Sequence, residues 1–131
     1  MSDKILTQKK VIDLLAETVV IPEGYTHIGE FAFDYAQMSR VICPDGLKII
    51  RENAFSFCDE LEEINIPGTV TKIGKCAFFK CKKLKVLKLS NNVRNIGYMA
   101  FANCENLTIH APKGSYAIEY AKKNKIPYCE I

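Results

Sequence analysis

The residues best able to do chemistry gather in one lysine-rich stretch, residues 72–89 of the 131-residue chain. It holds Cys76 and Cys81, and a Gly74-Lys75 pair stands just before the first thiol. Thiolates can bind zinc, and a glycine loop that ends in lysine can cradle a nucleotide phosphate. Clustered lysines can also bind nucleic acid. Each of these sites requires a particular spacing, which the sequence can be checked against.

The spacing argues against all three sites. A zinc knot uses paired C-x2-C units or histidine partners, and neither accompanies Cys76 and Cys81. A phosphate loop needs Ser or Thr after its lysine, where this chain has Cys76, and the five residues between Gly68 and Gly74 are one too many. The net charge of +3 is mild for a dedicated nucleic-acid binder. We therefore expect no metal, no cofactor and no nucleic-acid partner.

Composition predicts a folded chain that does not enter a membrane. Hydrophobic residues make up 48% and charged residues 25% of the sequence, which is typical of a folded domain. No run approaches the roughly 18 apolar residues that span a bilayer. The first 20 residues lack the form of a signal peptide, so we expect a cytoplasmic protein if Met1 is the natural start. A trimmed chain could instead come from a cell-surface protein.

An internal repeat gives the thiols a structural explanation. Ala-Phe pairs recur at intervals of 22 or 23 residues, as Ala32-Phe33, Ala54-Phe55, Ala77-Phe78 and Ala100-Phe101. Five residues before each Phe stands an isoleucine, as Ile28, Ile50, Ile73 and Ile96. Three residues after it stands a small residue, as Ala36, Cys58, Cys81 and Cys104. A repeat of this length is the signature of a solenoid, whose units are stable only when stacked.

Each unit predicts a short strand, a bend and an arc. The stretch "LEEINIP" alternates polar and apolar residues in its last part, as a strand does. Gly24, Gly46 or Asn92 follows the strand and suits a bend with positive φ. The Ala-Phe segment then returns the chain in an irregular arc. Stacked strands would make one parallel sheet with the thiol column buried, Cys43 pointing inward and Cys129 the most reactive thiol.

The pattern resembles the BspA-type leucine-rich repeats of bacterial proteins. Segments that carry the resemblance are "LEEINIPGTVTKIGKCAFFKC" and "LKVLKLSNNVRNIGYMAFANC", and the likeness extends over residues 21–128. It implies an α/β repeat fold, a leucine-rich-repeat solenoid of about four units with a short-stranded parallel sheet and a helical cap at each end. Such repeats commonly occur in bacterial surface proteins that contact other proteins, so the resemblance also implies protein binding.

Both ends of the stack are predicted to carry helices, because open solenoid ends expose the core. Residues 7–18 place apolar side chains at helical spacing after Thr7, a suitable N-cap. A second helix would begin after Ser115 and end before Pro127. The predicted organisation is a capping helix in residues 1–20, repeats in residues 21–111, and a capping helix with a tail in residues 112–131.

The exposed strand positions form the candidate binding face. Neighbouring strands would place Arg40 opposite Glu63 and Glu62 opposite Lys85, as cross-strand ion pairs. These pairs are compatible with an ordinary solvated sheet face or with a docking surface of mixed charge. The candidate residues are Arg40, Ile42, Glu62, Glu63, Asn65, Lys85, Lys88 and His110.

The favoured function is a non-catalytic protein–protein interaction module that uses this face. Neither His27 nor His110 stands in a nucleophile or metal motif, so we expect no enzyme activity. The alternatives are a cytosolic scaffolding protein that self-associates and a fragment of a cell-surface adhesin. The sequence names no particular protein partner.

Overall fold

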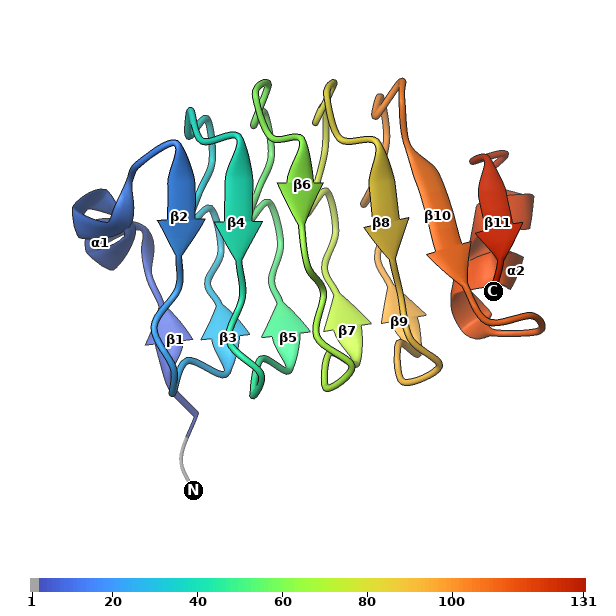
Figure 1. The fold of residues 1–131 in the computed structure, drawn as a ribbon, viewed down its shortest axis with the longest axis horizontal. Coiled ribbons are helices and arrows are strands. Elements are labelled where there is room, and N and C mark those ends of the chain that lie inside the picture. Colours follow the sequence, from blue (N-terminus) through green and yellow to red (C-terminus); the bar gives the residue numbers. More distant parts are fainter. Residues whose placement is uncertain (1–2) are drawn as a thin grey trace.

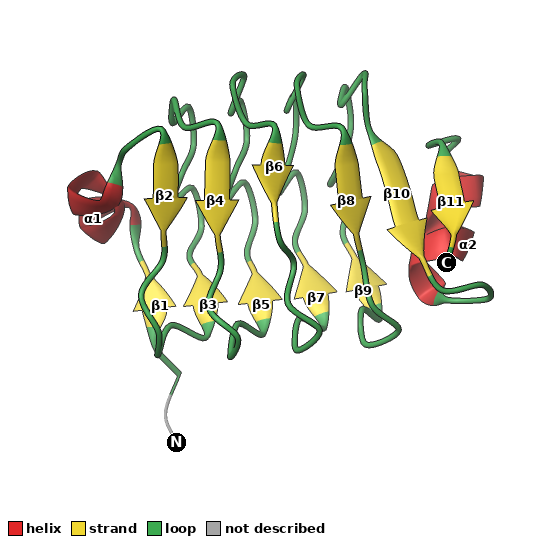
Figure 2. Cartoon of the chain, in the orientation of Figure 1, coloured by secondary structure: helices red, strands yellow, loops and turns green. Residues whose placement is uncertain are grey.

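Short parallel strands line two sides of an elongated stack of coils in the computed structural model, which describes residues 3–131 (Figure 1). Strands and turns make up nearly all of the chain, and helices occur only at the two ends (Figure 2). The strands are β1 (Ile5–Leu6), β2 (Thr18–Val20), β3 (His27–Ile28), β4 (Arg40–Ile42), β5 (Ile49–Ile50), β6 (Glu63–Ile64), β7 (Lys72–Ile73), β8 (Val86–Lys88), β9 (Asn95–Ile96), β10 (Thr108–Ala111) and β11 (Tyr128–Glu130). The helices are α1 (Gln8–Val11), which a 3-10 turn over Ile12–Leu14 extends, and α2 (Tyr116–Lys123).

The strands form three parallel sheets, where the sequence predicted one. One side of the stack is a continuous sheet in the order β1-β3-β5-β7-β9. The other side is divided into β2-β4-β6 and β8-β10-β11. The five-stranded sheet was missed because each of its strands is only two residues long, too short to show an alternating pattern.

The repeated columns fix the register of these strands. Ile28, Ile50 and Ile73 are directly paired across the five-stranded sheet, and all three are fully buried. On the other side, Val41 lies opposite Ile64, as the repeat predicted. A shift of one residue would turn these aliphatic side chains outward, so burial selects a single register.

The arcs between the two sides stack through a row of core rings. Phe33, Phe55, Phe78 and Phe101 are at most 3% exposed. Their ring centroids are separated by 5.0, 5.1 and 5.4 Å along the stack, and neighbouring rings are nearly parallel. Because each ring packs on the ring of the next coil, no coil has a core of its own.

Left-handed backbone occurs mainly in these arcs, and at only one of the three bend residues for which the sequence predicted it. Of the predicted bend residues, only Gly24 has positive φ, at 99°. In each arc the residue before the Ala-Phe pair and the residue two after its Phe are left-handed instead. These positions are Phe31, Tyr35, Asn53, Phe57, Cys76, Lys80, Met99 and Asn103. Their residue types vary, so residue type alone does not identify them.

The helix predicted over residues 7–18 is wrong in length. Helix α1 spans four residues, Thr7 makes no side-chain capping bond, and Thr18–Val20 is strand β2. Ile12 and Leu15 of the predicted apolar stripe are exposed, while Val11 is buried. Because Val19 lies opposite Val41 and is fully buried, pairing of this β-branched segment replaces the helix.

The C-terminal helix follows the prediction closely. The Ser115 hydroxyl accepts a hydrogen bond from the Ile118 N–H at 3.3 Å, which makes Ser115 the N-cap. Ala117 and Ala121 are fully buried against the last coil. In the strand before the helix, Ile109 and Ala111 are both fully buried. In Figure 1, α2 and β11 lie at the opposite end of the stack from α1.

Candidate functional site

Seven of the eight candidate residues line one groove on the sheet face. The groove encloses about 700 Å³ over β4, β6 and β8, and we call it the sheet-face groove. Exposed Ile42 and Val86 give it apolar surface, and charged side chains surround them. His110 does not line the groove, since it lies half-buried on β10. The groove is lined by Arg40, Val41, Ile42, Glu62, Glu63, Ile64, Asn65, Lys85, Val86 and Lys88.

One of the two predicted ion pairs is present. The Arg40 Nη2 atom lies 3.3 Å from the Glu63 Oε2 atom, across β4 and β6. Glu62 and Lys85 do not form the second pair in the described part of the chain. The cause is the break in the sheet, since β6 and β8 share no paired register. The nearest bridge between these coils is instead Lys83 Nζ to Glu60 Oε1, at 2.7 Å, before the strands begin.

Asn65, directly after β6, has a structural role beside the groove. Its side-chain oxygen accepts a hydrogen bond from the Cys43 N–H at 2.8 Å, and its amide donates to the Cys43 carbonyl at 3.3 Å. Two backbone groups of the preceding coil are thereby satisfied by a side chain, in place of a strand partner. Asn65 is also exposed, so one amide both holds the coil and borders the groove.

The thiol column is structural. The Sγ–O distances from each thiol to a backbone carbonyl of the preceding coil are 2.9 to 3.2 Å, for Cys58 to Phe33, Cys81 to Phe55 and Cys104 to Phe78. Burial raises the pKa of Cys43 to about 12. A hydrogen bond with Cys81, together with burial, also raises the pKa of Cys104. Cys43 and Cys104 therefore stay protonated near neutral pH and are poor nucleophiles.

The six cysteines differ in exposure to solvent. Cys129 is exposed in β11, as predicted, whereas Cys76 and Cys104 are partly buried. Cys43 and the central column thiols, Cys58 and Cys81, are buried.

His27 is a buried histidine with local partners. Its Nδ1 atom lies 2.8 Å from the Thr26 hydroxyl, and its Nε2 atom lies 3.8 Å from an Asp3 carboxylate oxygen. Burial outweighs the attraction of Asp3 and lowers the pKa of His27. The ring is only 5% exposed, so it has little access to a substrate.

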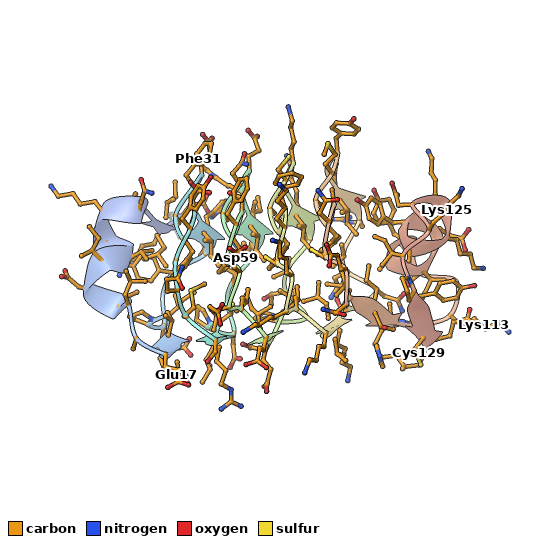
Figure 3. The ribbon with its side chains drawn as sticks, turned by 90° about the horizontal axis from the view of Figure 1, so that it is seen from above. Glu17, Phe31, Asp59, Lys113, Lys125 and Cys129 are labelled. Atoms are coloured by element: carbon orange, nitrogen blue, oxygen red, sulfur yellow. The ribbon has the colours of Figure 1, made fainter. Side chains whose placement is uncertain are left out.

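Aromatic side chains form a row on the outside of the arcs. In Figure 3, Phe31 lies on this arc side and Glu17 lies on the opposite side, where the sheet face is. Tyr35 stacks on Phe57 with centroids 4.5 Å apart, and Phe57 meets the Phe79 edge at 5.4 Å. The Lys80 ammonium lies about 5.5 Å from both phenylalanine rings. These contacts use the ring faces within the chain, so the row mainly stiffens the arcs.

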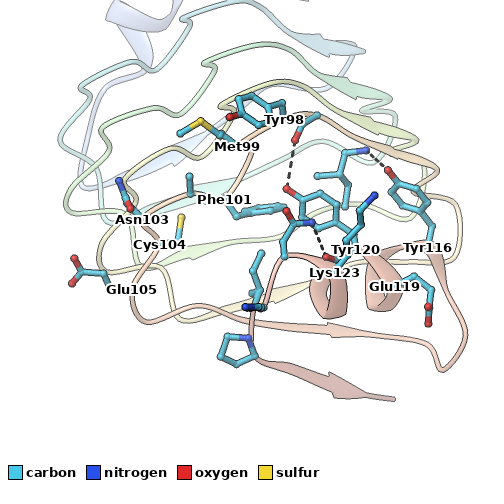
Figure 4. Close-up of a pocket in the computed structure, with 17 residues that line it drawn as sticks. Tyr98, Met99, Phe101, Asn103, Cys104, Glu105, Tyr116, Glu119, Tyr120 and Lys123 are labelled. Carbon is cyan, nitrogen blue, oxygen red and sulfur yellow. Dashed lines mark hydrogen bonds between the residues drawn. The ribbon is translucent and has the colours of Figure 1, made fainter.

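Sequence reasoning missed a second hollow, at the C-terminal end of the stack. A cleft of about 780 Å³ separates the last arc from α2 and the segment that follows it (Figure 4). Tyr98, Met99 and Asn103 line one wall, and Tyr120 and Lys123 line the other. No pattern in the sequence indicates this cleft, because it depends on how α2 is placed on the last coil.

The comparisons with known proteins agree with this geometry. Residues 13–124 match the family described as "BspA type Leucine rich repeat region", in six copies. The chain belongs to this family. The sequence predicted about four repeats, whereas the family model describes six copies.

Solved leucine-rich repeat structures resemble the chain. The T. pallidum leucine-rich repeat protein TpLRR is 36% identical, with a TM-score of 0.68, over 71% of this chain and 44% of that chain. A leucine-rich repeat protein from Bacteroides capillosus is 23% identical, with a TM-score of 0.64, over 72% of this chain and 77% of that one. The pneumococcal vaccine antigen PcpA is 14% identical, with a TM-score of 0.55, over 95% and 42%. The last two likenesses concern the fold alone.

The chain thus spans less than half the length of the T. pallidum protein. No curated protein matches the chain. Within residues 3–131, no helix has the length and apolar character that crossing a membrane requires.

Proposed function

We propose that this chain is a non-catalytic protein-binding module that uses the sheet-face groove. The observation that supports this most is the groove itself, where exposed Ile42 and Val86 sit among charged side chains. Protein interfaces commonly combine an apolar centre with a polar rim. Membership of a repeat family whose extended faces serve as binding surfaces favours the same assignment.

The charges around the groove favour a partner of mixed charge. Arg40 and Glu63 partly neutralise each other, while Glu62, Lys85 and Lys88 are exposed around the two apolar side chains. Opposite charges side by side select orientation more than raw affinity. A partner would place an apolar side chain between Ile42 and Val86 and match the alternating charges beside them.

A charge exchange that keeps the net charge constant tests this proposal. The double variant Glu62→Lys with Lys85→Glu inverts the polarity of the groove and disrupts no ion pair of the fold. The matched control, Glu52→Lys with Lys72→Glu, makes the same exchange at exposed positions outside the groove. Proteins captured from native lysate by immobilised chain are quantified, and the affinity of each is then measured with purified partner.

We expect the groove variant to lose at least tenfold in affinity, since inverted charges repel a complementary partner. The control should bind as the unaltered chain does. Equal binding by the groove variant would show that partners do not use this face.

A further inference from the structure

The arcs of the stack are joined by backbone hydrogen bonds at every second residue. In each of the first three arcs, three alternate N–H groups donate to carbonyl oxygens of the following coil, at N–O distances of 2.7 to 3.2 Å. The donor–acceptor pairs are Phe31–Glu52, Phe33–Ala54, Tyr35–Ser56, Asn53–Lys75, Phe55–Ala77, Phe57–Phe79, Cys76–Tyr98, Phe78–Ala100 and Lys80–Ala102. This pattern is the arc equivalent of a parallel strand ladder.

The last arc has the same backbone but no following coil to accept its bonds. Met99 and Asn103 have φ of 56° and 60°, matching the equivalent positions of the earlier arcs. Within residues 3–131, the N–H groups of Met99, Phe101 and Asn103 have no acceptor. We call this row of three donors the arc ledge. The intervening N–H groups donate within the arc, from Ala100 to Gly97, Ala102 to Met99 and Cys104 to Phe101.

The other two sides of the last coil are closed by the C-terminal segment. The Ile96 N–H of β9 donates to the Tyr116 hydroxyl at 3.1 Å. Strand β11 pairs with β10 through three residues. The Tyr120 ring covers the Phe101 ring edge-on at 6.3 Å, and so takes the place of a further core phenylalanine (Figure 4). Only the arc side of this coil is left with open donors.

The arc ledge forms one wall of the C-terminal cleft, so incoming atoms can reach it. A ligand that excludes water from this cleft must supply acceptors for these donors, because a buried donor without an acceptor is costly. Tyr98 is 74% exposed and Met99 is 37% exposed, which adds apolar surface next to the donors. A ligand with both carbonyl oxygens and an apolar group would satisfy both features.

We propose that the arc ledge binds an extended peptide segment of a partner protein, whose alternate backbone carbonyls accept the three free N–H groups. Extended peptides join unpaired backbone edges elsewhere in the same way. A whole second copy fits less well, because α1 covers the opposite end of the stack and Tyr120 occupies the position that another core ring would need. The proposal is independent of the sheet-face groove, which lies on another side of the stack.

Amide hydrogen exchange, followed by NMR on the full chain, tests the proposal residue by residue. In the free protein, the amides of Met99, Phe101 and Asn103 should exchange at least tenfold faster than the equivalent paired amides of Cys76, Phe78 and Lys80. The probes are three blocked peptides with the sequences of residues 52–57, 75–80 and 98–103, which are segments whose carbonyls meet such donors in this stack. Each carries Ala at its core Phe (Phe55→Ala, Phe78→Ala or Phe101→Ala), because Tyr120 fills that place.

At least one peptide should bind and slow exchange at the three ledge amides by tenfold or more. The variant Met99→Asp places a carboxylate against the incoming carbonyls and should weaken binding at least tenfold. Phe31→Asp is the matched control, because Phe31 is exposed and has the same left-handed backbone in the first arc. It should bind the peptide as the unaltered chain does.

Four results would overturn the proposal. The first is slow exchange at the ledge amides without peptide, and the second is that none of the peptides binds. The third is that a peptide slows amide exchange only in the sheet-face groove. The fourth is that exchange at the ledge slows as the protein concentration rises, without any peptide. The third result would leave the proposed function of the groove standing. The fourth would identify a second copy of the chain as the occupant.

Discussion

Phenylalanine rings and cysteine thiols are packed side by side in the interior of the stack. The phenylalanine rings stack at about 5 Å, and Cys58, Cys81 and Cys104, beside the last three rings, each donate to a carbonyl of the preceding coil. A hydroxyl could make the same bond, but a thiol costs less to bury in apolar surroundings. The thiols thus serve the packing of the coils, and the raised pKa values of Cys43 and Cys104 follow from their burial in it.

Stability should fall at alkaline pH because Cys43 stays protonated in the folded state. Its pKa is about 12 when folded, against an ordinary value of 9.0. Between these values the unfolded chain releases a proton that the folded chain keeps, so stability declines as pH rises from 9 towards 12. The decline can reach about 1.4 kcal/mol per pH unit for one thiol.

Urea unfolding between pH 8 and 10.5 measures this decline. Cys43→Ala should flatten the dependence of the unfolding free energy on pH, while Cys129→Ala, at an exposed thiol, should leave it unchanged. An identical slope in Cys43→Ala and the unaltered chain would refute the assignment.

Strands whose alternating buried residues recur from repeat to repeat were predicted correctly from the sequence. Several elements without such a recurring pattern were missed. The inward residues of β4, β6 and β8 were predicted from the columns, and the N-cap of α2 was predicted from its serine. The short helix α1, the five-stranded sheet and the break between β6 and β8 were not. Two-residue strands carry no period, and the helical spacing of residues 7–18 competes with strand pairing of Thr18–Val20.

The same contrast holds for the candidate sites. The residues of the sheet-face groove could be listed from strand alternation, whereas the arc ledge is a property of the backbone. Left-handed positions such as Cys76 and Met99 have no residue type in common, so the donors they direct are invisible in the sequence.

The arc conformation predicts an unusual pattern of substitution effects at Cys76. Its φ is 55°, so Cys76→Val should cost about 1–3 kcal/mol, because a β-branched side chain is strained there. Cys76→Gly should be neutral or stabilising by up to about 1 kcal/mol, since glycine adopts this conformation freely. Urea denaturation measures both values.

Lys75→Val is the control for this pair, at an adjacent exposed residue without positive φ. It should change stability by less than about 0.5 kcal/mol. Equal losses for the two valine variants would mean that backbone strain does not explain the result.

Across the whole molecule, stability depends on contacts between neighbouring coils. Each Ala-Phe coil contributes one ring, one small residue of the column Ala36, Cys58, Cys81 and Cys104, and a few aliphatic side chains to an interior shared with its neighbouring coils. In such a stack the energy is a sum of unit terms and nearest-neighbour terms. Coils that are in contact should therefore be coupled energetically, while coils separated by another coil should be independent.

Double-mutant cycles with Phe→Leu substitutions measure this coupling directly. Phe55 and Phe78 are in adjacent coils with their rings 5.1 Å apart, whereas Phe33 and Phe78 have the Phe55 ring between them. From urea unfolding, we expect a coupling free energy of about 0.5–1.5 kcal/mol for the adjacent pair. The separated pair should show none beyond about 0.3 kcal/mol, the usual error of additivity. Equal coupling in both pairs, or none between Phe55 and Phe78, would contradict the shared interior on which this account rests.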